Sequence, residues 1–451
     1  MVIFQETVQS LKRFIGKSSL GEYARLMVLR MVLTFIMHRG RMTCSAAAGS
    51  IACETVHRGQ LTRFLARARW QKEDFNSSLR KELLDLEVGQ GTFILAFDVT
   101  ITSQSGEKTE NTYYTGKRER KKKGRRYKKF AHKKCHSFTT GLLITPSGIR
   151  IPFQKPHYTK EYCIHRNIPY RTTAEKAAEL IRELPVPASA KVVVLGDTAY
   201  DAKVVRDACD ERGYTWIVPA NPERVYEGPK GNRPKLRSRT KDWNRLPLKT
   251  VRLQMATGPY AVYRRLSKWR IGSKQKPRVY YAYQEKLDVR SIGRVQLVFS
   301  TMNSDSKKAT PDEIKILMTN DVNLRLRDVI ELYSLRWQIE LFFKELKSTL
   351  GFAQYSFQKF TAVEAWAEIA LTTVLFLEWE RAKHLRDRRL SKKERDWWAS
   401  QRTHGLCCAF QQQCEEQELK YMSDRLKTPG GIEKLKRLIA AATPKEYRMK
   451  G

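Results

Sequence analysis

The chain has 451 residues, of which 41% are hydrophobic, and this is enough to build a buried core and to exclude a wholly disordered protein. Its length indicates roughly two to four structural units. The 85 Lys and Arg against 47 Asp and Glu give a formal net charge of +38. Such a charge requires an acidic partner, and nucleic acid is the first candidate, ahead of an anionic membrane surface.

A membrane partner is the weaker interpretation. The apolar stretch 26–37 is interrupted by Arg30 and is shorter than the roughly 20 residues that cross a bilayer. The first residues lack the basic start, apolar segment and cleavage site of a secretory signal, in that order. We therefore expect no membrane association and a cytoplasmic location.

The eight cysteines are scattered and indicate reduced thiols rather than a disulfide framework. A zinc site fits no common ligand spacing here, and ordinary buried thiols are the favoured interpretation. The residues weighed for zinc are His404, Cys407, Cys408 and Cys414.

Residues 1–90 are expected to be helical and to form a DNA-binding region. The small-residue stretch 44–53 and the segment 61–70 resemble two helices around a turn. Arg63, Arg67 and Arg69 decorate the second of them. A helix-turn-helix that binds DNA and a helical bundle with a solvated basic face both fit this pattern.

Residues 91–220 alternate between strand and helix patterns, which predicts an α/β sheet. The apolar run 93–97 ends at Asp98, and the run 192–195 ends at Gly196 and Asp197, so both indicate buried strands. Further strands are expected at 136–144, 149–153 and 214–218, and helices at 173–184 and 201–212.

The alternation stops at residue 221, and 221–293 is predicted to be a β-rich insertion. The core resumes over 294–358, with a strand at 294–301 and a long helix at 321–351. The apolar spacing of 359–384 predicts another helix. It opens a helical C-terminal region, 359–451, whose large apolar residues suggest dimerisation.

Three carboxylates form the candidate site. Asp98 and Asp197 each follow a predicted strand, although a lone Asp there is more often a cap or turn former. Glu340 lies on the predicted helix 321–351. At 100° per residue it falls within a sector of roughly 60° together with Tyr333, Arg336 and Lys347. Glu345 is predicted to point away from that edge.

This combination suits phosphodiester chemistry. Two divalent ions about 3.5–4 Å apart can activate a water and stabilise a leaving oxygen. Three carboxylates can hold two such ions, and hard oxygen ligands favour Mg²⁺. Arg and Lys at the same edge would bind phosphates.

The spacing Tyr333-x2-Arg336-x3-Glu340-x6-Lys347 resembles the Y-R-E-K signature of bacterial insertion-sequence DDE transposases, in the group called insertion-sequence family four. The segments around Asp98 and Asp197 resemble the two aspartate blocks of that family. The resemblance covers about residues 90–385.

The resemblance implies an α/β fold with a ribonuclease-H-like catalytic core, in a bacterial protein associated with the nucleoid. It implies two Mg²⁺ ions, with Mn²⁺ as a substitute, held by Asp98, Asp197 and Glu340. Tyr333, Arg336 and Lys347 would contact DNA. The partners would be double-stranded DNA, as inverted-repeat ends and target, and a second protomer in a synaptic complex. The reaction would be cut-and-paste transposition, in which a freed 3′-hydroxyl attacks DNA.

One feature departs from the family. Some relatives stack a flipped base on an aromatic residue from the strand before the signature helix. We expect that strand to offer Gln296 and Leu297 instead. Trp216, Trp243 and Trp269 are the alternatives, so base flipping and a hairpin intermediate stay open.

The segment 117–134 contains twelve Lys or Arg and one Glu, with Tyr127, Phe130 and His132 among them. Cations alternating with aromatics suit DNA backbone binding with stacking, although a solvated charge run is the alternative. The predicted DNA contacts are Lys121, Lys122, Lys123, Arg125, Arg126, Lys128 and Lys129.

The insertion supplies a second basic surface. Its residues include Arg233, Lys235, Arg237, Arg239, Lys241, Arg264, Arg265 and Arg270.

Two rival functions remain. The first is a nuclease with a ribonuclease-H fold that cleaves DNA without joining it. The second is a DNA-binding derivative of a transposase that has lost activity, against which the presence of all three carboxylates argues.

Overall fold

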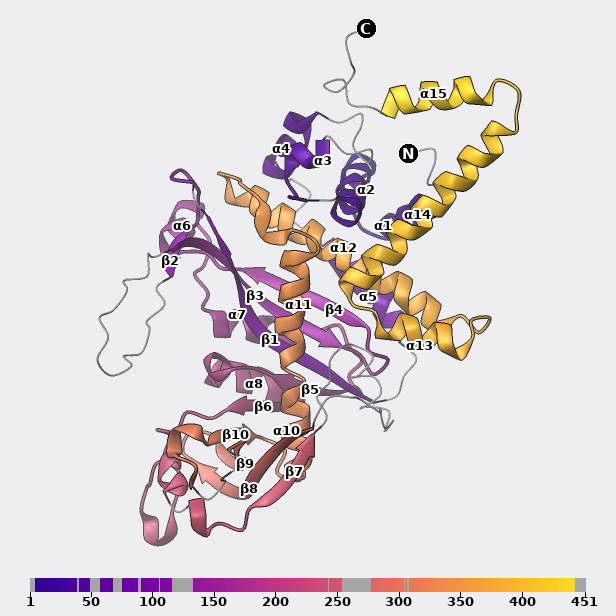
Figure 1. The fold of residues 1–451 in the computed structure, drawn as a ribbon. Coiled ribbons are helices and arrows are strands. Elements are labelled where there is room, and N and C mark those ends of the chain that lie inside the picture. Colours follow the sequence, from indigo (N-terminus) through magenta and orange to yellow (C-terminus); the bar gives the residue numbers. More distant parts are fainter. Residues whose placement is uncertain are drawn as a thin grey trace.

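The computed structural model describes residues 5–38, 40–48, 57–67, 75–87, 91–104, 106–115, 133–241, 243–253, 277–303, 305 and 308–442. They form a mixed α/β fold in which one ten-stranded sheet runs through the molecule and helices cover it (Figure 1). The predicted α/β class is confirmed.

The sheet has the strand order β2-β3-β1-β5-β6-β10-β9-β8-β7, and β4 also pairs with β3. Strands β1, β5 and β6 are parallel to one another, and the other pairings are antiparallel. The strands are β1 Thr92–Ser103, β2 Tyr113–Thr115, β3 Lys133–Ile144, β4 Arg150–Pro156, β5 Lys191–Leu195, β6 Thr215–Pro219, β7 Lys249–Leu253, β8 Arg278–Val289, β9 Gly293–Thr301 and β10 Lys315–Thr319.

Strand β1 is longer than the sequence predicts. The expectation that it ends at Asp98 is wrong, because its antiparallel pairing with β3 continues from Asp98↔Thr140 to Ser103↔Cys135. A tight turn joins β3 to β4: the Gly148 amide donates to the Thr145 carbonyl, and Gly148 has a φ of 82°, which favours glycine.

The insertion does not form a sheet of its own. Its strand β8 pairs with β9, and β7 pairs with β8, so the two extend the core sheet to its edge. Strand β10, which the sequence pattern did not reveal, lies between β6 and β9 and is antiparallel to both. The insertion is therefore continuous with the strands that carry the candidate site.

The N-terminal helices pack against the long helix α12, Phe360–Arg386. Trp366, Leu375 and Phe376 of α12 are completely buried and Trp379 is 8% exposed, so these side chains belong to the core of the same chain. The sequence-based inference that these apolar residues of α12 mark a partner surface is therefore wrong. Helix α12 is long and apolar enough to cross a membrane, but 83% of its apolar window is buried inside the fold.

The other α-helices divide into an N-terminal group, a group beside the sheet and a C-terminal group (Figure 1). They are α1 Gln5–Gly16, α2 Glu22–Met37, α3 Cys44–Ala48, α4 Arg58–Arg67, α5 Asn76–Asp85, α6 Lys160–Arg166, α7 Thr173–Arg182, α8 Lys203–Glu211, α10 Leu326–Ser334, α11 Trp337–Ser348, α13 Lys392–Ser400, α14 Thr403–Leu426 and α15 Gly431–Ala442.

Candidate active site

Asp98 lies within β1, and Asp197 lies two residues past the end of the neighbouring parallel strand β5. Strands β1 and β5 are parallel, with Ala96 opposite Leu195. Asp98 and Asp197 each lie two residues beyond this pair, so the register brings them to the same edge of the sheet. Gly196 permits the turn after β5, because a Cβ there would lie 2.6 Å from the Cβ of Tyr200. The Asp197 carboxylate then accepts a hydrogen bond from the Ala199 amide at 2.9 Å.

Glu340 reaches the aspartates from helix α11, which packs against β1. The predicted single helix 321–351 is wrong in one respect: it is divided into α10 and α11 at Leu335 and Arg336. There the backbone hydrogen bonds span three residues in place of four, as in a 3-10 helix, and the Arg336 amide donates to the Tyr333 carbonyl. The break falls at the predicted DNA-contacting arginine, whose backbone keeps helical dihedral angles.

Arg336 joins two of the three carboxylates. Its guanidinium donates to Asp98 at 3.4 Å and to Glu340 at 2.5 Å. All three side chains are half-buried, so the pairing is less screened than a surface ion pair. The positive charge of Arg336 offsets the repulsion between Asp98 and Glu340.

The electrostatics of Asp98 show that the three acids share one site. Burial raises the pKa of Asp98, and the charges of Asp197 and Glu340 raise it further. The Val99 amide and Arg336 act in the opposite direction. A carboxylate with two acidic neighbours is stabilised by added positive charge.

Tyr333 and Lys347 also face this site. Burial raises the pKa of Tyr333 to about 12, and the nearby positive charge of Arg336 acts in the opposite direction. Burial lowers the pKa of Lys347, while the charge of Asp98 favours its protonated form. The structure therefore gathers all six residues predicted from the signature and the aspartate blocks, namely Asp98, Asp197, Tyr333, Arg336, Glu340 and Lys347.

Lys315 is a member of this cluster that the sequence did not reveal. It begins strand β10, and its ammonium lies 4.5 Å from the centre of the Tyr333 ring. The packed surroundings lower the pKa of Lys315 even though its side chain keeps contact with solvent, Arg336 lowers it further, and Glu340 acts in the opposite direction. The signal that could have found it is the short apolar run 316–318 directly after Lys315, which lies in strand β10.

A divalent ion fits the donors of this site in kind, because carboxylate oxygens are its preferred ligands. The Tyr200 hydroxyl supports a polar occupant. It is buried and has no hydrogen-bond partner among the described residues, and the charges of Asp98 and Asp197 add to burial in raising its pKa. In this conformation Arg336 lies between Asp98 and Glu340. Within the described ranges no three acidic, His or Cys side chains converge closely enough to hold a metal ion.

Glu345 does point away from Asp98, but into the protein interior. It accepts from Arg150 at 2.9 Å and from the Thr403 hydroxyl at 2.8 Å. Arg150 also donates to Glu378 of α12 at 2.9 Å. The helix that carries Glu340 is thus anchored from behind by a buried ion-pair network. The prediction that Glu345 points away from the Glu340 edge therefore holds, and its side chain has a structural role in the interior.

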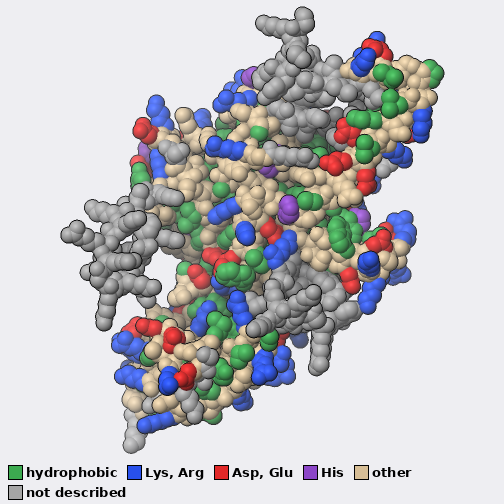
Figure 2. Space-filling view, viewed as in Figure 1, with side chains coloured by type: hydrophobic (Ala, Val, Ile, Leu, Met, Phe, Trp, Pro, Cys, Tyr) green, Lys and Arg blue, Asp and Glu red, His purple; other side chains and the backbone are tan. Residues whose placement is uncertain are grey.

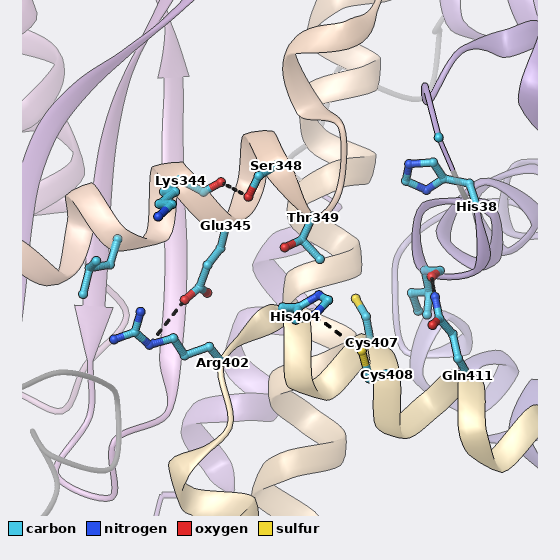
Figure 3. Close-up of a pocket in the computed structure, with 13 residues that line it drawn as sticks. His38, Lys344, Glu345, Ser348, Thr349, Arg402, His404, Cys407, Cys408 and Gln411 are labelled. Atoms are coloured by element: carbon cyan, nitrogen blue, oxygen red, sulfur yellow. Dashed lines mark hydrogen bonds and ion pairs between the residues drawn. The ribbon is translucent and has the colours of Figure 1, made fainter.

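A hollow of about 540 Å³ adjoins this network, between α11, α14 and the end of α2 (Figure 3). Arg402 and His404 point into it, and the Cys408 sulfur lies 3.7 Å from His404 Nε2. Of the residues weighed for zinc, Cys407 and Cys414 are buried thiols and Cys408 is exposed.

The second basic surface is largely neutralised by acidic neighbours. Figure 2 shows Asp and Glu among the Lys and Arg side chains around the insertion. Lys235 and Arg237 pair with Glu223, and Arg239 pairs with Glu285. Arg233 also pairs with an acid, at 3.5 Å. Another basic position, which the sequence analysis did not single out, is a hollow lined by Lys249, Arg252, Arg325 and Arg327.

The basic loop contacts Lys121, Lys122, Lys123, Arg125, Arg126, Lys128 and Lys129 lie outside the described residues, as do Arg69, Arg264, Arg265, Trp269 and Arg270. Trp216 and Trp243 are each 2% exposed, so neither offers a face for stacking on a base. The strand before the signature helix is β10, not the strand with Gln296 and Leu297, and it too contains no aromatic residue.

Comparison with known proteins relates the segment that carries most of this site to one protein family. Residues 165–376 match the family described as Transposase DDE domain. The match includes Asp197, Tyr333, Arg336, Glu340 and Lys347, while Asp98 precedes it. No curated protein matches the chain. The segment that carries most of the candidate site is thus similar to the transposase DDE domain, and this similarity supports a DDE transposase.

Proposed function

We propose that this protein is a cut-and-paste DNA transposase of the insertion-sequence family four type. The observation that carries the proposal is the position of Asp98 on β1 beside Asp197, which follows the parallel strand β5, with Glu340 joined to Asp98 through Arg336. The strand order β4-β3-β1-β5-β6, with only β3 antiparallel to β1, supports a ribonuclease-H-like core.

Asp98, Asp197 and Glu340 would hold two Mg²⁺ ions, for which Mn²⁺ could substitute. The bound ions would make a water nucleophilic and neutralise charge on the leaving oxygen. Arg336 would exchange its carboxylate partners for a DNA phosphate, which its fork of donors fits. Tyr333 and Lys347, which border the acids, would hold the neighbouring backbone.

The DNA partners would be the inverted-repeat ends of an element and its target, bound in a bacterial cytoplasm at the nucleoid. The net charge of +38 supports a polyanionic partner. Basic contacts beyond the site would come from the cations of the 117–134 segment and from the exposed arginines of α4, Arg58, Arg63 and Arg67. Strand β10 supplies no aromatic residue, so the proposal includes no base flipping.

Two protomers would act on two ends. The surface proposed for their contact is the distal part of α14 together with α15, which extends from the body of the molecule (Figure 1). Leu419, Leu426 and Ile432 are 67%, 59% and 59% exposed there. Large exposed apolar side chains on a projecting helix are typical of a partner surface.

The test is incubation of the purified protein with Mg²⁺, a duplex that bears the ends of the DNA element carrying its gene, and a supercoiled target plasmid. We expect strand cleavage that requires the ends and the ion, followed by joining of the 3′-ends to the plasmid. Cleavage without joined products would identify a nuclease. End binding with neither product would identify an inactive DNA-binding derivative.

A further inference from the structure

Lys315 is placed at the catalytic edge of the sheet by the direction of its strand. Strands β5 and β6 are parallel, and Asp197 follows the carboxyl end of β5. Strand β10 is antiparallel to β6 with Leu317 opposite Pro219, the last residue of β6. The start of β10 therefore lies at the same edge as the aspartates, and Lys315 is the residue that begins it.

The ammonium of Lys315 is held over an aromatic ring rather than by an acid. It lies 4.5 Å from the Tyr333 ring centre, within the range of a cation–π contact. No ion pair joins Lys315 to an acidic side chain in the described part of the chain. The residue remains exposed to solvent. A cation held on a ring face leaves its N–H donors free for a ligand.

The surroundings of Lys315 suit an anion. Arg336 and Glu340 are the charged groups close enough to influence it. Arg336 is already engaged with Glu340 and Asp98. An anion between Lys315 and Arg336 would be attracted by two cations, while the charge of Glu340 would oppose it.

We propose that Lys315, Tyr333 and Arg336 form a phosphate subsite, and that Lys315 binds the DNA phosphodiester next to the one that is cleaved. This inference rests on the proposed function for the identity of the polymer. The subsite itself requires only a phosphodiester. Lys315 acts as a positioning residue: it fixes the backbone so that the neighbouring bond lies over the three carboxylates.

The experiment compares full-length Lys315→Met with the wild type in the absence of divalent ions, which removes cleavage from the readout. Binding to an end-bearing duplex is measured by fluorescence anisotropy across a salt series. One lost phosphate contact makes the slope of log affinity against log salt shallower by about 0.9. Lys315→Arg should restore the slope, because a cation remains.

Lys308→Met is the matched control, since Lys308 lies in the same stretch and pairs with Asp305; its slope should equal the wild type's. With Mg²⁺ present, Lys315→Met should cut about 10-fold to 100-fold more slowly, and Lys315→Arg should recover most of the rate. A Lys315→Met slope equal to the wild type's would overturn the subsite. If Lys315→Met also melts at a lower temperature, the Lys315→Arg variant decides the question. A wild-type salt slope for Lys315→Arg supports the subsite, and a slope as shallow as that of Lys315→Met overturns it. If the wild type binds but never cuts, the proposed function fails while the salt slopes still judge the subsite.

Discussion

Arg150 donates a hydrogen bond to Glu345 across a buried contact of 2.9 Å, and both side chains are nearly inaccessible to solvent. Arg150 is the first residue of strand β4, whereas Glu345 lies on the helix that carries Glu340. The same arginine pairs with Glu378. The network therefore couples the position of the helix that carries Glu340 to strand β4 and to α12.

Replacing Glu345 by Ala should destabilise the protein by about 3–5 kcal/mol, because Arg150 would lose one of its two buried partners. Urea unfolding measures this. Asp207→Ala, which breaks the exposed pair with Lys203, should cost less than about 1 kcal/mol. Equal losses from the two variants would mean that the network contributes no more than a surface pair.

His157 should make stability sensitive to acid. Burial lowers its pKa from 6.5 to about 4, with repulsion from Lys176 as the second cause. The folded protein thus disfavours the protonated ring. The contribution of neutral His157 to the free energy of unfolding is fully present above pH 6.5 and is lost as pH falls towards about 4. The loss should be of order 2 kcal/mol.

Unfolding of His157→Gln measured at pH 7 and pH 4.5 checks this. The variant keeps a partner for the Thr139 hydroxyl, which lies 2.7 Å from the ring nitrogen. Its stability should fall less between the two pH values than that of the wild type. A parallel fall in both proteins would assign the acid sensitivity to other groups.

Neutralising Lys121, Lys122, Arg125 and Arg126 to Gln should weaken binding to any duplex, whatever its sequence. Each lost phosphate contact should reduce the salt slope by about 0.9. Lys308→Gln, the exposed partner of Asp305, provides the control. An unchanged slope for the four-residue variant would make the loop a solvated charge run.

Assembly should depend on the projecting C-terminal helices. Replacing Leu419, Leu426 and Ile432 by Glu should abolish a two-protein, two-end complex in solution mass measurements while single-end binding persists. Lys420→Glu, on the same helix, should leave pairing intact. Removing everything after Lys383 is not a clean test, because it deletes Phe410 and Cys414 from the core. Pairing by the triple variant would move the contact elsewhere.

The sequence predicted the parts of the site that depend on short local patterns. The runs before Asp98 and Asp197 became β1 and β5, and the spacing of Tyr333, Arg336, Glu340 and Lys347 survived the break between α10 and α11. The break mattered little because the turn at Arg336 keeps helical dihedral angles, with a φ of −53° and a ψ of −33°.

Features that depend on distant partners could not be predicted from such patterns. The extension of β1 through Asp98 depends on pairing with β3, and the insertion joins the core sheet through β9. Lys315 reaches the site because of the direction of β10. The burial of Glu345 requires Arg150, which is 195 residues away in sequence.

The most direct test of the central claim is Mg²⁺-dependent cleavage of an end-bearing duplex by Asp98→Asn, Asp197→Asn and Glu340→Gln, with binding of the same duplex measured in parallel. Each variant should lose cleavage by about a thousandfold or more, because a lost metal ligand removes several kcal/mol of transition-state stabilisation. Binding should persist, and the Asp207→Asn control should cleave normally. Cleavage by any of the three variants within about tenfold of the wild-type rate would contradict a single site built from these carboxylates.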